Sequence, residues 1–369
     1  MTVGLTHHVG HYRLPFSSSW QSPHGAVVPA GPQGAASLVT RTTLPLIVGV
    51  GALLVAGCRG PQSALDPAGR GAERIAALFW GMTVGAAIIW LAVIVLAIYA
   101  IRMRHAAHSQ RAADRLIIGG GAVLPTVVLT GLLAYGLAAL PELVGPAPAG
   151  TLQVAVSGEQ WWWRVRYLVP GGNGTAAELA NEVRLPVGKP VEFHLESPDV
   201  IHSFWIPALG GKIDMIPGRT NRLVLTPTRT GLFRGVCAEF CGTSHALMSL
   251  YVVVLEPADF AAWLADQQTP ARPPALPLAE RGQELFLANG CGACHTVRGT
   301  SADGVVGPDL THVGSRLSLG AGILPNNPEA FRRWIAHTDN VKPEVLMPAF
   351  GMLPPEEIEA LAAYLDGLE

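Results

Sequence analysis

Two long apolar segments stand out along the chain, at residues 75–101 and 116–140, and neither contains a charged residue. A helix rises ~1.5 Å per residue, so each segment would reach ~37–40 Å, more than the ~30 Å hydrocarbon core of a bilayer. The pattern predicts a two-helix transmembrane hairpin over residues 75–140. A buried helical hairpin of a soluble protein is the alternative, which the length and the lack of charge disfavour.

The segment between these helices is short and carries four arginines, Arg102, Arg104, Arg111 and Arg115. Short loops rich in Arg and Lys usually remain in the cytoplasm. Both outer ends of the hairpin, including everything after residue 140, are therefore expected on the outer, periplasmic face of a bacterial cell membrane. The chain would then be a multi-pass membrane protein.

A shorter apolar run, residues 44–57, follows a basic residue and precedes the hairpin. It is too short to span a bilayer, and such a run is typical of a secretory signal. Its end, residues 55–58, resembles a bacterial lipoprotein cleavage box, which makes Cys58 a candidate for lipidation; an ordinary buried cysteine is the alternative. Residues 1–57 are thus expected to be a cleaved extension and signal, and residues 58–74 the mature N-terminal segment.

After the hairpin the pattern changes to short runs in which apolar and polar residues alternate, separated by Gly and Pro turns. The clearest runs are residues 152–156, 191–195, 222–225 and 250–255. An alternation with a period of two residues predicts β strands. Residues 150–256 are therefore expected to form a small all-β sandwich or barrel.

The composition adds three constraints. Hydrophobic residues make up 49% of the chain and charged residues 14%, a balance that leans toward membrane association. A net charge of -2 without a basic stripe gives no reason to expect nucleic acid as a partner. The chain has five cysteines, and an odd number argues against a simple disulfide framework.

The β-rich segment holds a dense group of soft metal ligands. Cys237, Cys241, His245 and Met248 lie close together, and His202 lies in a separate stretch before them. Thiolate, imidazole and thioether groups suit copper, and a second cysteine lets the loop bridge two metal ions, unlike a mononuclear blue-copper site. A zinc site could use the same cysteines and histidines but would not need the thioether of Met248 as a ligand. A disulfide between Cys237 and Cys241 is the other alternative in an exported protein.

The order Cys-x-Glu-x-Cys-x-x-x-His-x-x-Met resembles the binuclear CuA loop of the cytochrome c oxidase subunit II family. Residues 158–163, 199–205 and 209–219 agree with the same family. With the paired helices before them, the resemblance covers roughly residues 75–256. It implies a cupredoxin-like domain that holds a pair of coppers.

By that resemblance Cys237 and Cys241 bridge the coppers, His202 and His245 are terminal ligands, and Met248 is a weak ligand. Glu239 would ligate through its backbone carbonyl, which leaves its side chain for a magnesium ion at the boundary with subunit I. Trp161 matches the exposed aromatic residue of the family at the face where electrons enter. Trp162 and Trp163 crowd it, so which of the three rings is exposed is left open.

A proline-rich stretch predicts a semi-rigid linker at residues 257–278, before a last domain at residues 279–369. That domain contains Cys291-Gly-Ala-Cys294-His295, the attachment signature of c-type haem. Two thiols three residues apart reach the two vinyl groups of haem, and the next histidine is placed beneath the iron. A thioredoxin-like redox pair is the alternative, but the βαβ pattern of that fold is missing.

The surroundings of this motif resemble small class I cytochromes c, which are all-α. Helices are predicted at residues 279–288, 327–335 and 355–365. Pro308 lies in a turn like the one that supports the proximal histidine. Met347 matches the methionine loop opposite His295 and is the implied sixth iron ligand, with Met352 as the competitor. His312 and His337 are expected at the surface, and His312 is kept open as an axial ligand.

The order of domains resembles subunit II of a caa-type haem–copper oxidase. The resemblance implies a binuclear copper centre and a covalent haem c, subunit I and other membrane subunits as partners, and cytochrome c or a quinol–cytochrome c reductase as donor. Electrons would pass from the donor to the haem, then to the copper pair, then to subunit I, where the oxygen chemistry lies. A copper-containing nitric oxide reductase is an alternative. A copper-delivery factor is another, which the attached haem disfavours.

Overall fold

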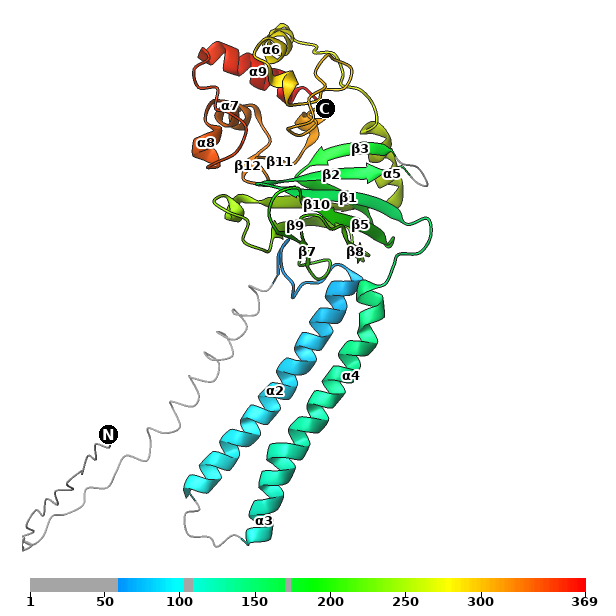
Figure 1. The fold of residues 1–369 in the computed structure, drawn as a ribbon, viewed down its shortest axis with the longest axis vertical. Coiled ribbons are helices and arrows are strands. Elements are labelled where there is room, and N and C mark those ends of the chain that lie inside the picture. Colours follow the sequence, from blue (N-terminus) through cyan, green and yellow to red (C-terminus); the bar gives the residue numbers. More distant parts are fainter. Residues whose placement is uncertain (1–58, 103–108, 170–173) are drawn as a thin grey trace, which may run out of the picture. The chain divides into compact units, whose positions relative to one another are not determined.

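The computed structural model describes residues 59–102, 109–169 and 174–369. The secretory signal and the lipidation candidate Cys58 lie outside the described residues, so both stay predictions. Among the described residues the two apolar segments are helical (Figure 1). The first is α2 (Arg70–Arg102), and the second runs through α3 (Gln110–Arg115), the π-helix η1 (Leu116–Val123) and α4 (Leu124–Val144).

Both long helices leave their apolar side chains exposed instead of packing them into a protein core. The most apolar 18-residue windows of the spans Arg70–Arg102 and Gln110–Pro141 have mean hydropathies of 2.7 and 2.1, and none of their residues is buried. A core helix of a soluble protein would bury this surface. The helices therefore have the length, composition and exposure expected of a membrane hairpin, and the soluble alternative does not fit them.

The first turn of α2 is attached to the β domain by backbone hydrogen bonds. The Arg70 N–H donates to the carbonyl of Thr226 over 3.0 Å, and the Ala72 N–H donates to that of Leu209 over 3.3 Å. These bonds use N–H groups that have no partner within the helix itself. The start of the helix is therefore tied to the sandwich.

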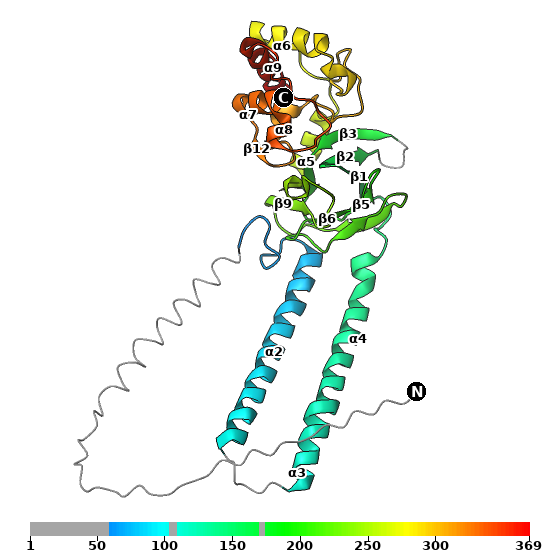
Figure 2. The same ribbon diagram turned by 60° about the vertical axis from the view of Figure 1, so that its left-hand side comes forward.

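Residues 152–255 form two five-stranded sheets, as the alternating pattern predicts (Figure 2). The sheet orders are β3-β2-β1-β5-β8 and β4-β10-β9-β6-β7. The strands are β1 (Leu152–Glu159), β2 (Trp162–Leu168), β3 (Thr175–Ala180), β4 (Glu182–Pro186), β5 (Val191–Glu196), β6 (His202–Trp205), β7 (Ile213–Met215), β8 (Asn221–Leu225), β9 (Gly231–Cys237) and β10 (Ser249–Leu255). Alternate residues face a core that includes Trp163, Phe193 and Phe204.

A helix lies where the linker was expected to begin. Helix α5 (Pro257–Asp266) packs on the β domain, with the rings of Phe260 and Trp263 at 6.2 Å and 5.4 Å from that of Tyr167. Residues at i and i+3 lie on one face of a helix, which explains why both rings reach the same partner. The proline-rich connection is thus limited to residues 267–276.

The C-terminal domain is mainly helical. Its elements are α6 (Pro277–Ala288), η3 (Cys291–Ala293), η4 (Val313–Ser315), β11 (Ser318–Leu319), β12 (Leu324–Pro325), α7 (Pro328–Ala336), α8 (Thr338–Val341) and α9 (Pro355–Asp366). As predicted, Asn327 caps α7, and its side chain accepts a hydrogen bond from the Ala330 N–H over 2.9 Å. Helices α6 and α9 pack so closely that a Cβ on Gly282 would lie 2.0 Å from the carbonyl oxygen of Ala360.

Candidate metal and haem sites

The copper-ligand candidates are brought together by one sheet. His202 begins β6, and Cys237 ends the neighbouring strand β9, where the pairing sets Cys237 opposite Phe204. The loop after β9 carries Cys241 and returns through a short 3-10 helix that begins at His245. Met248 follows, and its carbonyl accepts a hydrogen bond from the Cys237 N–H over 3.0 Å.

All five predicted side chains converge. The sulfur of Cys237 lies 3.8 Å from that of Cys241 and 3.8 Å from Nδ1 of His202. The sulfur of Cys241 lies 3.5 Å from Nδ1 of His245 and 3.9 Å from the sulfur of Met248. A disulfide requires ~2.05 Å between sulfurs, so the two cysteines are free and the disulfide alternative does not fit this arrangement.

The ligand atoms face a buried space. His202, Cys237, Cys241 and Met248 are buried, and His245 is half-buried. Nε2 of His202 bonds with a carboxylate oxygen of Asp199 at 2.8 Å, which leaves Nδ1 directed at the Cys237 sulfur. A carboxylate on the second nitrogen of a histidine is the usual way to orient a metal ligand. Asp199 was not among the predicted site residues. Its position three residues before His202 could have indicated a carboxylate near that imidazole.

The two thiols compete for one proton. The hydrogen bond between the two thiols lowers the pKa of Cys237 to about 3, and the same bond raises the pKa of Cys241. Burial opposes the charged form of His202, but the hydrogen bonds with Cys237 and Asp199 outweigh it and raise the pKa of the ring. Deprotonation of the pair is therefore favoured at Cys237, and thiolate is the form of cysteine that binds a soft cation.

The residues fit a copper pair. Two sulfurs, two imidazole nitrogens and a thioether all point inward, and the backbone carbonyl of Glu239 accepts from the Cys237 thiol at 3.2 Å. Carbonyl oxygen and thioether are the weak ligands that copper accepts beside thiolate and imidazole. The Glu239 side chain is exposed.

The sequence left open which of the three tryptophan rings is exposed. Trp161 is only 5% exposed and Trp163 is fully buried, whereas Trp162 is half-buried. Trp161, which was matched to the exposed aromatic residue of the family, is therefore buried in this structure. Its indole N–H donates to the carbonyl of Cys241 over 3.0 Å, as does the side-chain amide of Gln160 over 2.8 Å. The ring is held against the metal-binding loop, a contact that no local sequence pattern encodes.

The haem-attachment motif is arranged for a covalent haem. Nδ1 of His295 bonds with the carbonyl of Pro308 at 2.9 Å, so Nε2 is left for an iron. A Cβ on Gly307 would lie 2.5 Å from the His295 ring, so only glycine lets this loop approach so closely. Cys291 is half-buried and Cys294 is exposed, and both thiols are free. This donor set fits a c-type haem.

The two candidates for the sixth iron ligand, Met347 and Met352, differ in burial. Met347 is half-buried, and its carbonyl accepts from the Thr338 hydroxyl at 3.1 Å, whereas Met352 is 77% exposed. His337 is exposed as predicted, but His312 is not, because it is buried and its Nε2 bonds with the carbonyl of Thr269 at 3.1 Å. His312 therefore joins the linker to the cytochrome domain.

The fold and the two ligand sets define a membrane-anchored metalloprotein in which a cupredoxin-like β-sandwich precedes a c-type cytochrome domain. Comparison with known families agrees with this class. The family model described as "Cytochrome C oxidase subunit II, periplasmic domain" matches residues 152–255, and the model described as "Cytochrome c" matches residues 279–369.

Individual relatives match along nearly the whole chain. A cytochrome c oxidase subunit 2 of Alkalihalophilus pseudofirmus is 35% identical over 335 residues, which cover 86% of this chain and 94% of the relative. One of Bacillus subtilis is 29% identical over 90% of this chain and 99% of its own. The crystal structure of the periplasmic domain of subunit II of cytochrome oxidase of Bradyrhizobium japonicum is 34% identical, with a TM-score of 0.31, and covers 33% of this chain and 97% of its own.

The chain belongs to the cytochrome c oxidase subunit 2 family, in the form with a fused C-terminal cytochrome c domain that is typical of caa-type oxidases. It is a membrane protein with a periplasmic domain and a subunit of a haem–copper oxidase, an oxidoreductase complex that includes subunit I. The subunit II domain implies CuA copper, and the cytochrome domain implies haem c.

Proposed function

We propose that this chain receives electrons at its cytochrome c domain, passes them to its copper domain, and delivers them from there to subunit I. When bound, haem c and the copper pair each take up and release one electron. The observation that carries the proposal is that one chain holds both ligand sets, with Trp161 of the copper domain hydrogen-bonded to the metal-binding loop.

The protein residues contribute rigidity. Cys237, Cys241, His202 and Met248 are buried and in contact with one another, so their positions need to change little when an electron arrives or leaves. Asp199 holds the imidazole of His202, and the Pro308 carbonyl holds that of His295. Such preset ligands reduce the rearrangement that accompanies electron transfer.

The roles of single residues follow from this scheme. Cys237 and Cys241 would bridge the coppers, with His202, His245, Met248 and the Glu239 carbonyl completing the set. Cys291 and Cys294 would hold the haem, with His295 and Met347 on its two faces. Because Trp161 is buried, we propose that it serves electrons that arrive from the cytochrome domain, and that the external donor meets that domain first.

The remaining parts of the scheme concern the surroundings of the subunit. Cytochrome c or a quinol–cytochrome c reductase would be the donor, and both soluble domains would lie on the outer face of a membrane crossed twice. The exposed Glu239 side chain would be free to bind magnesium at the boundary with subunit I.

The order of electron transfer is testable by rapid mixing of the oxidised complex with a reduced cytochrome donor without oxygen. The visible band of haem c is expected to change before the near-infrared band of the copper pair. In a haem-free variant, Cys291→Ala with Cys294→Ala, reduction of the copper should slow by about 100-fold, because an intramolecular step is replaced by a bimolecular one. Copper reduction at the unaltered rate in that variant would contradict the proposal.

A further inference from the structure

Lys342, which follows α8 in the cytochrome domain, inserts its ammonium group into the copper domain. Nζ donates to the carbonyl of Trp161 at 2.5 Å and to that of Leu247 at 2.9 Å, and within its own domain to that of Gly320 at 3.1 Å. The side chain is only 2% exposed. A buried ammonium is costly unless its hydrogen atoms find acceptors, and here three carbonyls supply them.

The carbonyls that Lys342 holds lie beside the copper ligands. Leu247 stands between His245 and Met248 in the sequence, and the indole of Trp161 is hydrogen-bonded to Cys241. The ammonium therefore fixes backbone at two sides of the metal-binding loop. Ser244 adds a bond from its hydroxyl to the carbonyl of Pro343 at 2.7 Å.

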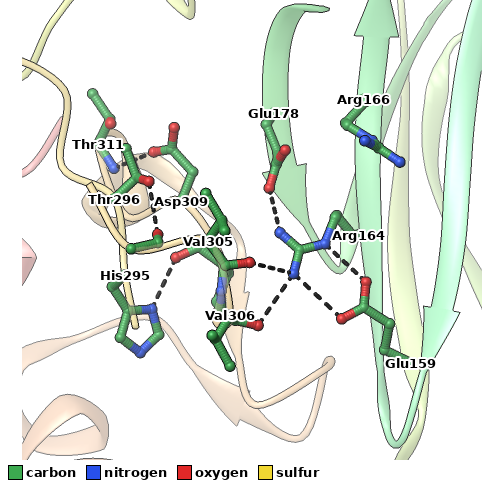
Figure 3. A network of polar contacts seen from close by, with 12 residues as sticks. Glu159, Arg164, Arg166, Glu178, His295, Thr296, Val305, Val306, Asp309 and Thr311 are labelled. Atoms are coloured by element: carbon green, nitrogen blue, oxygen red, sulfur yellow. Dashed lines mark hydrogen bonds and ion pairs between the residues drawn. The ribbon is translucent and has the colours of Figure 1, made fainter. Parts of the chain in front are cut away.

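Arg164 on β2 makes the converse contact, from the copper domain into the cytochrome domain (Figure 3). Its guanidinium pairs with Glu159 at 2.8 Å and Glu178 at 2.7 Å and donates to the carbonyls of Val305 and Val306 at 3.1 and 3.2 Å. Two carboxylates of the copper domain thus hold the planar guanidinium of Arg164 in place, and its N–H groups also donate to carbonyls of the cytochrome domain.

The backbone that Arg164 holds supports the haem ligand. Val305 and Val306 come directly before Gly307 and Pro308, and the Pro308 carbonyl binds Nδ1 of His295 (Figure 3). The chain of contacts therefore runs from a strand of the copper domain to the proximal histidine of the haem.

Further bonds cross the same interface. The Leu317 N–H donates to a carboxylate oxygen of Glu182 over 2.8 Å, and the Ser249 N–H donates to the carbonyl of Ala321 over 3.2 Å. Arg234 donates to the carbonyl of Gly322 at 3.1 Å. Polar groups of each domain thus find hydrogen-bond partners in the other domain.

We propose that Lys342 and Arg164 are positioning residues that dock the cytochrome domain on the copper domain as one fixed unit. Each cation of one domain holds the backbone beside a metal ligand of the other. The alternative is a domain that swings on the proline-rich connection and touches the copper domain only transiently. The docking itself does not require electron transfer; its consequence for the relay rests on the function proposed above.

Hydrogen exchange on the full chain with both cofactors in place tests the docking without reference to activity. The amides of Leu317 and Ser249 bond across the interface, so their exchange reports on separation of the domains. Both amides should be protected in the natural protein. With Lys342→Met or Arg164→Met their exchange should become about tenfold faster or more, because either substitution removes a group of bonds between the domains.

Two matched substitutions serve as controls. Lys189→Met removes an exposed lysine, and Arg166→Met removes an arginine on the same strand whose ion pair is with Glu196 of its own sheet. Neither should change the exchange of the two interface amides. If Lys342→Met does not retain copper and haem, Arg164→Lys, which keeps the charge but loses the fork, is expected to speed exchange in the same direction.

A distance measurement by pulsed electron paramagnetic resonance between the oxidised haem iron and the copper pair completes the test. The natural protein should give one narrow distribution, which broadens in Lys342→Met and not in Lys189→Met. Unprotected amides with a broad distribution in the natural protein, or no change in either variant, would overturn the docking. A narrow distribution without electron transfer between the domains would instead overturn the proposed relay and leave the docking intact.

Discussion

In the copper domain one ligand, His202, comes from a distant part of the chain, whereas in the cytochrome domain the haem-attachment residues lie within five positions of one another. His202 and Cys237 are 35 positions apart and meet because β6 and β9 pair. Cys291, Cys294 and His295 belong to one short motif, and only the orientation of the histidine depends on a carbonyl further along, that of Pro308. The copper site is thus a product of the folded sheet, and the haem site is mainly a product of local sequence.

This contrast has an energetic consequence. The copper ligands are buried and share hydrogen bonds, so the loss of one member disturbs the whole set. The haem would be held by covalent bonds to Cys291 and Cys294. Loss of a noncovalent contact would therefore change the ligands of the iron without releasing the haem.

Cys237→Ser should abolish the copper pair completely, because this sulfur contacts both Cys241 and His202. Metal analysis and electron paramagnetic resonance of the purified complex would measure the loss. The haem c spectrum should be unchanged, since no haem-attachment residue is touched. A full complement of copper in the variant would refute the bridging role of this cysteine.

Met347→Ala should remove the sixth ligand of the haem iron while the haem stays attached. The ferric spectrum is then expected to lose the features of methionine ligation, and the reduced protein should bind carbon monoxide readily. Met352→Ala is the matched control, because that side chain is 77% exposed and should change neither property. The reverse result would assign the ligand to Met352.

Asp199→Asn should weaken copper binding by about 10–100-fold, because the carboxylate orients His202 through its Nε2. A competition titration with a copper chelator would measure the change. Haem content serves as the internal control, since it should stay constant. Unchanged copper affinity would mean that the sheet alone orients the imidazole.

Asn327→Ala should have the smallest effect, a loss of about 1 kcal/mol of stability confined to the cytochrome domain. As the N-cap of α7, the side chain accepts one hydrogen bond, from the Ala330 N–H, which is not a metal ligand. Thermal unfolding followed by the haem band should detect it, while the copper band keeps its midpoint. A larger loss at the copper band would show that the two domains unfold together.

The same contrast explains how much could be predicted from the sequence. The haem motif, the capped helix at Asn327 and the long apolar helices are local patterns, and the structure contains each of them. The alternating strands were recognised for the same reason. His202 could be joined to the cysteines only through the family resemblance, because no local rule connects residues on different strands.

The features that were missed depend on tertiary contacts. His312 is buried against the carbonyl of Thr269, and Trp161 is buried against the metal-binding loop, although neither has an unusual local sequence. Nothing in the local sequence distinguishes Lys342 and Arg164 from ordinary surface cations. The contact between the two domains makes Lys342 a buried hydrogen-bond donor and gives Arg164 acceptors in the other domain.

The copper pair is tested most directly by the copper content and electron paramagnetic resonance spectrum of the oxidised complex. We expect about two copper atoms per haem c, with one unpaired electron shared equally by both coppers through thiolate bridges. A single copper with the spectrum of an isolated ion, or zinc in its place, would contradict this expectation.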